Sequence, residues 1–142
     1  MNDFLAFVIQ YWALWLATAL LVVLILYFEI REHAHGINQL SAQEVVRWMN
    51  HERAVVVDVR EAHVFAEGHI VGSINLPFKQ MATELTSLEK YKEKPLILIC
   101  QAGIQALKAA KLLRRHGFKQ VVALKGGLGA WRVASLPLKK GK

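Results

Sequence analysis

The chain has 142 residues, of which 54% are hydrophobic, and its positive mean hydropathy excludes an ordinary soluble protein of this size. The formal net charge is +7, but the 18 lysines and arginines are spread along the sequence without a basic stripe interleaved with aromatic residues, so nucleic acid is not an expected partner. A single cysteine excludes a disulfide within the chain, as is usual in a reducing compartment.

The apolar residues are concentrated near the N-terminus. No charged residue occurs from position 4 to position 28, where Gln10 and Thr18 are the polar exceptions. As one helix, these 25 residues would be about 37 Å long, more than the roughly 30 Å of a bilayer's hydrocarbon core. We therefore expect a transmembrane helix over residues 4–28, after a short tail of residues 1–3. A cleaved signal peptide is the alternative, but no lysine or arginine precedes the segment and no cleavage site of small residues follows it.

The charge distribution predicts the orientation of this helix. All 18 lysines and arginines follow it, and Arg31 is the nearest. The positive-inside rule then places the N-terminus outside and the remainder of the chain in the cytoplasm, where the net positive charge favours attraction to an anionic membrane surface. Residues 29–38 are polar and are expected to form a linker. His33 and His35 lie within it without a third ligand in register, so no metal site is predicted.

A folded domain is expected to start after the linker. Ser41 and Glu44 form the pattern of a capping box, which predicts a helix at this point. Residues 54–59 are mostly β-branched and predict a buried parallel strand. Asp58 and Arg60 lie at the carboxyl end of this strand, where they can line a pocket or pair with each other.

Strands and helices alternate through the rest of the domain. This order predicts an α/β fold with a mainly parallel sheet that helices cover on both faces. His69 is expected to be a structural hydrogen-bonding residue rather than a catalytic base, because no serine or aspartate occurs at a supporting spacing. The expected elements are a short helix over 63–67, strands over 69–77, 96–99 and 121–124, helices over 78–94 and 104–116, and a last short helix at 126–131.

The chemistry is expected at Cys100, which lies between a buried strand and the helix that follows Gly103. Open α/β sheets bind ligands at the carboxyl ends of their strands, and the first turn of a helix presents unpaired N–H groups that stabilise a thiolate. Gly103 suits a tight loop whose amides turn toward the sulfur. The alternative is a cysteine that fills the core, which its position between strand and helix disfavours.

Three segments of the sequence resemble the motifs of rhodanese domains. Residues 58–77, with Asp-Val-Arg-Glu at the start and Gly-His-Ile-Val-Gly-Ser-Ile-Asn-Leu-Pro at the end, are similar to the N-terminal signature of the family. Residues 98–103 resemble its active-site loop, and residues 124–131 resemble its closing segment. The resemblance implies a rhodanese-like domain over residues 39–138, with a mainly parallel sheet flanked by helices, followed by a basic tail at 139–142.

The resemblance also implies a reaction, the transfer of sulfur. Cys100 would take the outer sulfur of a small donor of the thiosulfate or persulfide type, carry it as a persulfide and pass it to an unidentified acceptor, with no cofactor. The inward N–H groups of the loop would stabilise the persulfide anion. The loop residues expected to bind the substrate and the persulfide are Gln101, Ala102, Gly103, Ile104 and Gln105.

Gln105 departs from the family pattern, in which arginine is common at this position. A glutamine does not supply the cation that would bind an anionic donor, so weak turnover of thiosulfate is expected. Lys108 lies one helical turn further along and is the alternative cation, although a place on the solvated face of the helix is favoured. The short loop without arginine also makes phosphate-ester hydrolysis an unexpected activity.

Two other functions are compatible with the sequence. The first is a catalytically weak adaptor, which would use the rhodanese fold as a surface and the apolar helix to reach membrane-protein or protein-export partners. The second is a redox-sensing thiol, for which no second cysteine is present to resolve a sulfenate. The layout of one span before one domain is similar to that of small membrane-anchored bacterial rhodaneses, which implies an inner-membrane location.

Overall fold

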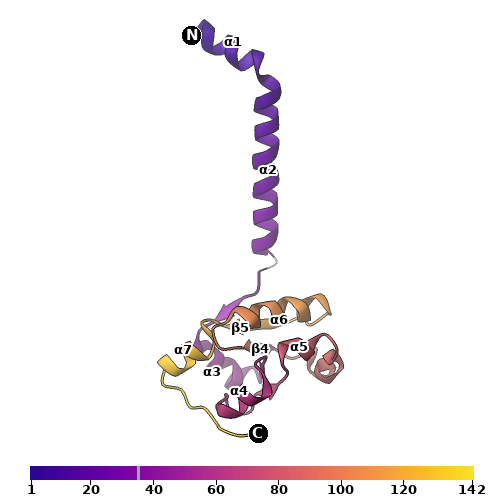
Figure 1. Cartoon of the computed structure of the whole chain (residues 1–142), viewed down its shortest axis with the longest axis vertical. Helices are drawn as coiled ribbons and strands as arrows, with labels where there is room; N and C mark the ends of the chain where they lie inside the picture. The colour runs from indigo at the N-terminus through magenta and orange to yellow at the C-terminus, as the bar shows by residue number, and fades with distance from the viewer. Residues whose placement is uncertain (35) are drawn as a thin grey trace. The chain divides into compact units, whose positions relative to one another are not determined.

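The computed structural model describes residues 1–34 and 36–142 and divides them into two compact units (Figure 1). The first unit is Met1–Gly36, and the second is Ile37–Lys142. His35 lies outside the described residues, and the expectation that His33 and His35 form no metal site lies outside them with it. Within the described ranges, no three histidine, cysteine, aspartate or glutamate side chains gather into a metal site.

The N-terminal unit consists of two helices, α1 (Asn2–Gln10) and α2 (Trp12–Ala34). Tyr11 separates them with φ −110° and ψ 25°; its N–H group closes α1 on the Phe7 carbonyl, and its own carbonyl accepts the first hydrogen bond of α2. The structure thus differs from the single helix expected over residues 4–28. Helix α2 also continues into the segment expected to be a linker. The break at Tyr11 could not be predicted from the sequence, because no glycine or proline occurs there.

One helix among the described residues is long and apolar enough to cross a membrane, judged by its length and composition. It comprises Trp12–Arg31 within α2, and none of it is buried inside the protein. Thr18 is a polar residue in this segment, and its hydroxyl donates a hydrogen bond to the Leu14 carbonyl at 2.9 Å. A satisfied hydroxyl of this kind is compatible with an apolar surrounding.

The C-terminal unit contains a parallel sheet of five strands in the order β1-β5-β4-β2-β3. Apart from Asp58 at the end of β2, the residues of the three central strands are aliphatic, as expected for a sheet that is buried on both faces. The third strand is two residues long, much shorter than the strand expected over residues 69–77. The strands are β1 (Gln39–Leu40), β2 (Val55–Asp58), β3 (Ile74–Asn75), β4 (Leu96–Ile99) and β5 (Val121–Leu124).

Helices cover both faces of the sheet, which confirms the predicted fold class (Figure 1). Alternate residues of each strand enter opposite cores, since successive side chains of a strand point to opposite faces. Leu98 packs with α6 in one core, whereas Ile97 and Ile99 pack with Val45 of α3 and Trp131 of α7 in the other. The helices are α3 (Ala42–His51), α4 (Ala62–Glu67), α5 (Phe78–Met81), the 3-10 helix η1 (Leu85–Tyr91), α6 (Ile104–Arg115) and α7 (Gly127–Val133).

Strand register brings the predicted site residues to one edge of the sheet. β2 pairs with β4 along its whole length, from Val55 beside Leu96 to Asp58 beside Ile99. The residues that directly follow these two strands therefore lie next to each other, and Cys100 is one of them. This is the edge at which open α/β sheets bind their ligands.

Candidate active site

Cys100 is a free cysteine between the end of β4 and the start of α6, and 3% of its surface is exposed. The Gly103 N–H group donates a hydrogen bond to its sulfur at 3.0 Å, and the Ala106 N–H group donates another at 3.4 Å. Both donors belong to the first turn of α6 or to the residue that caps it, where backbone N–H groups lack partners within the helix. The sulfur thus lies in a site that stabilises negative charge.

Gly103 makes this arrangement possible through its backbone conformation. It is the N-cap of α6 and has φ +96°, in the left-handed region that side chains disfavour. Space is not the constraint, because a Cβ added there would meet neighbouring backbone atoms at 3.5 Å, an ordinary contact distance. The residue was predicted from the sequence to turn the loop amides toward the sulfur, and its own N–H group does so.

The first turn of α7 binds the carbonyl groups of the thiol loop. The Leu128 N–H group donates to the Cys100 carbonyl at 2.9 Å, and the Gly129 N–H group donates to the Gln101 carbonyl at 3.2 Å. With these carbonyls directed at α7, the amides of the loop are free to face the sulfur. The resemblance of residues 124–131 to a closing segment did not predict these contacts.

A pocket of about 330 Å³ opens at the thiol. It brings together most of the residues predicted for the site, including Arg60 from the end of β2. Glu61 and Val64 were not predicted for the site, because nothing in the sequence pattern around α4 indicated which residues approach the loop. The lining residues are Arg60, Glu61, Val64, Cys100, Gln101, Ala102, Ile104 and Gln105.

Asp58 and Arg60 form a buried ion pair beside this pocket. Arg60 Nη2 lies 2.7 Å from Asp58 Oδ2, and the two side chains are 5% and 1% exposed. Arg60 Nε also donates to both carboxylate oxygens, and Nη2 donates to the Gly68 carbonyl at 2.7 Å. Arg60 therefore fulfils both alternatives given by the sequence, since it pairs with Asp58 and also lines the pocket. Asp58 is not among the lining residues.

The remaining candidates are placed away from the sulfur or lack a charge. Gln105 lines the pocket, whereas Lys108 is exposed and is not among the lining residues, in agreement with the solvated position favoured for it. His69 is 3% exposed, and its Nδ1 atom bonds to the Phe65 carbonyl at 2.9 Å. This hydrogen bond agrees with the structural role expected for His69.

Comparison with known proteins decides the family. The family model of the rhodanese-like domain matches residues 41–134. The chain belongs to the rhodanese-like family. The match spans every strand of the sheet after β1, together with the Cys100 loop and α7.

The relatives of this chain include a protein that aligns with it from end to end. YibN of Escherichia coli is 37% identical over 143 residues, and the alignment covers all of both chains. The thiosulfate sulfurtransferase GlpE of Shewanella oneidensis is 32% identical over 96 residues, which are 68% of this chain and 93% of that protein. The crystal structure of a rhodanese-related protein from Thermoplasma volcanium superposes with a TM-score of 0.65 at 25% identity, over 72% of this chain and 97% of that one.

Proposed function

We propose that this protein is a membrane-anchored sulfurtransferase that carries sulfur as a persulfide on Cys100. The observation that carries the proposal is the pair of hydrogen bonds from the Gly103 and Ala106 N–H groups to the Cys100 sulfur at the base of an open pocket. Kinship to GlpE, which is named as a thiosulfate sulfurtransferase, supports the same chemistry.

The reaction consists of two displacements at sulfur. The Cys100 thiolate attacks the outer sulfur of the donor, a bond forms between the two sulfur atoms, and the bond from the outer sulfur to the rest of the donor breaks. With thiosulfate as the donor, the leaving group would be sulfite. With an organic persulfide, the leaving group would be a thiolate. An acceptor nucleophile then attacks the same outer sulfur, and the Cys100 thiolate leaves. One covalent intermediate shared by both steps predicts ping-pong kinetics.

The loop N–H groups stabilise the sulfur anion in both steps. Fixed donors that point at a site of negative charge require no reorganisation during the reaction. The Leu128 and Gly129 N–H groups keep the loop in this orientation by holding its carbonyls. Gly103 and Ala106 therefore act directly on the sulfur, while the first turn of α7 acts through the loop.

The pocket lining favours an organic persulfide as donor over thiosulfate. Its cation, Arg60, donates from both Nε and Nη2 to Asp58 and the Gly68 carbonyl, so its charge is neutralised by a carboxylate. Val64 and Ile104 add apolar surface, and Ile104 is 65% exposed. A dianion such as thiosulfate gains little from this lining.

We further propose that α2 anchors the protein in the inner membrane, with the N-terminus outside and the rhodanese domain in the cytoplasm. The length and composition of Trp12–Arg31 support the span, and the position of all 18 lysines and arginines after residue 28 supports the orientation. An anchored carrier would deliver sulfur to acceptors at the membrane, and membrane proteins or the export machinery are the partners proposed.

The second candidate is an adaptor that uses the domain as a surface. Gln105 favours it, because this residue leaves the thiol pocket without an unpaired cation among the described lining residues. The adaptor function does not require sulfur on Cys100, so replacing the thiol separates the two proposals.

The test is the intact mass of the full chain in detergent after exposure to thiosulfate and, separately, to an organic persulfide. A gain of one sulfur atom that reductant reverses and that is absent in Cys100→Ser supports the carrier. A folded protein that keeps its mass with both donors contradicts it. If cells that carry Cys100→Ser behave like wild type, and unlike cells that lack the protein, the adaptor is the function.

A further inference from the structure

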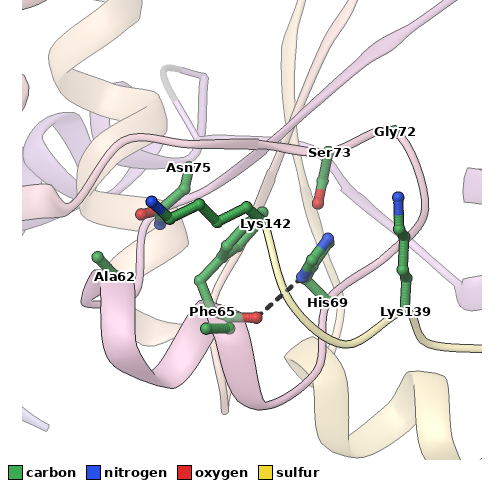
Figure 2. Close-up of a pocket in the computed structure, with 9 residues that line it drawn as sticks. Ala62, Phe65, His69, Gly72, Ser73, Asn75, Lys139 and Lys142 are labelled. Atoms are coloured by element: carbon green, nitrogen blue, oxygen red, sulfur yellow. Dashed lines mark hydrogen bonds between the residues drawn. The ribbon is translucent and has the colours of Figure 1, made fainter.

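A second pocket, of about 460 Å³, lies in the rhodanese domain and shares no lining residue with the thiol pocket (Figure 2). Helix α4 contributes to both pockets, with Val64 in the thiol pocket and Phe65 in this one. The second pocket is lined by Ala62, Phe65, Ala66, His69, Gly72, Ser73, Asn75, Lys139 and Lys142. No step of sulfur transfer uses these residues.

One wall of this pocket is the basic tail of residues 139–142, which is docked on the domain. The His69 N–H group donates to the Lys139 carbonyl at 2.9 Å, and the Lys139 N–H group donates to the His69 carbonyl at 2.7 Å, as in an antiparallel bridge. The Gly141 N–H group donates to the Ala66 carbonyl at 2.8 Å. These backbone bonds place the side chains of Lys139 and Lys142 at the pocket.

His69 presents one nitrogen to the pocket. Its Nδ1 atom donates to the Phe65 carbonyl, and its ring stacks on the Phe65 ring with centroids 3.8 Å apart. Its Nε2 atom has no protein partner among the described residues, although the residue is 3% exposed. Every fully buried side-chain nitrogen or oxygen of the described chain has a hydrogen-bond partner, so Nε2 reaches the open space of the pocket. In the view of Figure 2, Lys139 and Lys142 lie on either side of the imidazole, and the Lys142 side chain extends away from it toward Asn75.

The pocket is rich in positive charge. None of its nine lining residues is acidic, and neither Lys139 nor Lys142 forms an ion pair within the described part of the chain. The other donors are already used, because the Ser73 hydroxyl donates to the Ile70 carbonyl and the Asn75 amide donates to the Asp58 and Arg60 carbonyls. The two ammonium groups and the imidazole are therefore the groups left to bind a ligand.

We propose that this pocket binds a tetrahedral oxyanion, a phosphate or sulfate group, at Lys139 and His69, with Lys142 as a second positive charge in the same pocket. Ammonium groups attract such anions as point charges, and the Nε2 atom of the imidazole reaches the same open space. The volume exceeds what one inorganic anion fills, so an organic group attached to the oxyanion has space beside the Phe65 ring. The phosphate can belong to a soluble metabolite or to the headgroup of an anionic lipid.

The first test is a calorimetric titration of the full chain, in neutral detergent, with inorganic phosphate and with sulfate. We expect saturable binding at one site and a shift of the His69 imidazole signals in ¹⁵N NMR spectra. Lys139→Gln should weaken binding about tenfold, because a hydrogen bond to a charged group is lost. Lys140→Gln removes the same charge from the same tail but lies outside the pocket, and should change the affinity less than about twofold.

Lys139→Gln is suited to this test because it preserves the backbone bonds of Lys139 to His69 and removes an exposed side chain. A titration that does not saturate would overturn the proposal, and so would equal losses in the two variants, which indicate general charge attraction. Vesicles of phosphatidylglycerol and of phosphatidylcholine separate the two sources of phosphate. If phosphatidylglycerol vesicles displace inorganic phosphate, as read from the His69 imidazole signals, the ligand is a lipid headgroup. If they do not displace it, the ligand is a soluble phosphate.

Discussion

Under the proposed sulfur transfer, Gln105 is the residue expected to affect most which donor the thiol pocket accepts. Its side chain lines the pocket and carries no charge, while the nearby Arg60 is engaged with Asp58. A dianion that enters the pocket therefore loses its hydration without gaining a free cation. An uncharged or singly charged persulfide loses less, and the apolar Val64 and Ile104 favour its organic group.

Replacing Gln105 with arginine should raise kcat/KM for thiosulfate about tenfold, because a guanidinium at this place adds a charge-assisted hydrogen bond to the donor. The rate with an organic persulfide should change less than about threefold. Steady-state kinetics with both donors provide the measurement. Lys108→Gln is the matched control and should leave both rates unchanged, since Lys108 is exposed and outside the pocket lining. Equal gains with both donors would contradict the charge argument.

Breaking the buried Asp58 and Arg60 pair should cost more stability than breaking an ion pair on the surface. Replacing Asp58 with asparagine leaves the Arg60 guanidinium buried without a counter-charge and should lower the free energy of unfolding by about 3 kcal/mol. Urea unfolding measures the change. Glu61→Gln removes a carboxylate from an exposed pair, 3.5 Å from Lys79, and should cost less than about 0.5 kcal/mol. Similar losses in the two variants would show that burial of the Asp58 pair has no special effect.

At the scale of elements, the thiol loop depends on its contact with the first turn of α7. Gly127 has φ +61°, and a Cβ added there would collide with the carbonyl oxygens of Cys100 and Gln101. The loop would have to move away from α7, and the hydrogen bond from Leu128 to the Cys100 carbonyl would be lost. Any such movement also shifts the donors that face the sulfur.

Gly127→Ala should therefore slow persulfide formation on Cys100 by at least about tenfold and lower stability by about 2 kcal/mol. Intact mass measured on samples quenched at successive times after donor addition gives the rate of persulfide formation, and urea unfolding gives the stability. Gly72→Ala is the matched control, because Gly72 also has a positive φ, +80°, but a Cβ there meets nothing within 4 Å. It should cost stability through the backbone alone, by about 1 kcal/mol, and leave the rate unchanged. A normal rate in Gly127→Ala would contradict the role assigned to α7.

The capping box of α3 predicts a pH dependence. The Ser41 N–H group donates to Glu44 Oε2 at 2.8 Å, and the Ser41 backbone and hydroxyl hold the pKa of Glu44 below its ordinary value of 4.5. A carboxylate with a lowered pKa in the folded state stabilises the protein above its ordinary pKa, and this contribution is lost as the pH falls through the lowered value. Wild type should thus exceed Glu44→Gln in stability at neutral pH, and the difference should disappear in acid.

Thermal unfolding of wild type and Glu44→Gln from neutral pH to below pH 4.5 measures this dependence. Ser41→Ala removes the hydroxyl that accepts from the Glu44 N–H group, keeps the Ser41 N–H group that donates to the carboxylate, and should cost about 1 kcal/mol at neutral pH. In the Ser41→Ala background, Glu44→Gln should keep most of its effect at neutral pH, because the backbone N–H group of residue 41 still donates to the carboxylate. A stability difference that persists unchanged in acid would assign the effect of Glu44→Gln to something other than its charge.

Elements whose patterns are local were predicted well from the sequence. The aliphatic runs of β2, β4 and β5 and the capping box of α3 are each contained within a few residues, and the order of elements then favoured a parallel sheet. The position of Cys100 before α6 follows from the same local patterns. The fold and the location of the thiol loop were therefore accessible without a structure.

Features that depend on distant contacts were not accessible in this way. The bonds from Leu128 and Gly129 to the thiol loop join segments about 28 residues apart, and the docking of Lys139 beside His69 joins segments 70 residues apart. Val64 of α4 enters the thiol pocket through tertiary packing alone. The break at Tyr11 occurs without glycine or proline, so no residue there indicated that the apolar segment would form two helices.

At the scale of the molecule, the two units differ in composition and in how they are stabilised. The rhodanese unit, Ile37–Lys142, buries its apolar side chains in two cores on the faces of its own sheet. The helical unit, Met1–Gly36, has no buried residue in α1 and none in the Trp12–Arg31 segment, so its apolar surface requires another environment. In the proposed anchor, a bilayer would supply that environment, and the segment is long enough to cross one.

Removal of residues 1–36 should therefore release the domain from the membrane without unfolding it. We expect the free energy of unfolding of residues 37–142 to equal that of the domain in the full chain within about 0.5 kcal/mol, because no core residue of the domain is lost. Urea unfolding of both forms, with the full chain in detergent, gives this comparison. Flotation of cell membranes on a density gradient should find the full chain in the membrane fraction and the truncated chain in the soluble fraction.

A charge in the middle of the span provides the matched variant in the full chain. Leu20 lies near the centre of Trp12–Arg31 and is exposed, so Leu20→Arg should oppose insertion by about 3 kcal/mol and move protein out of the membrane fraction, whereas Leu20→Phe should have no effect. If the truncated chain still floats with membranes, its net positive charge holds it at the lipid surface and α2 is not the main anchor. High salt distinguishes that case, because it screens surface charge but leaves an inserted helix in place.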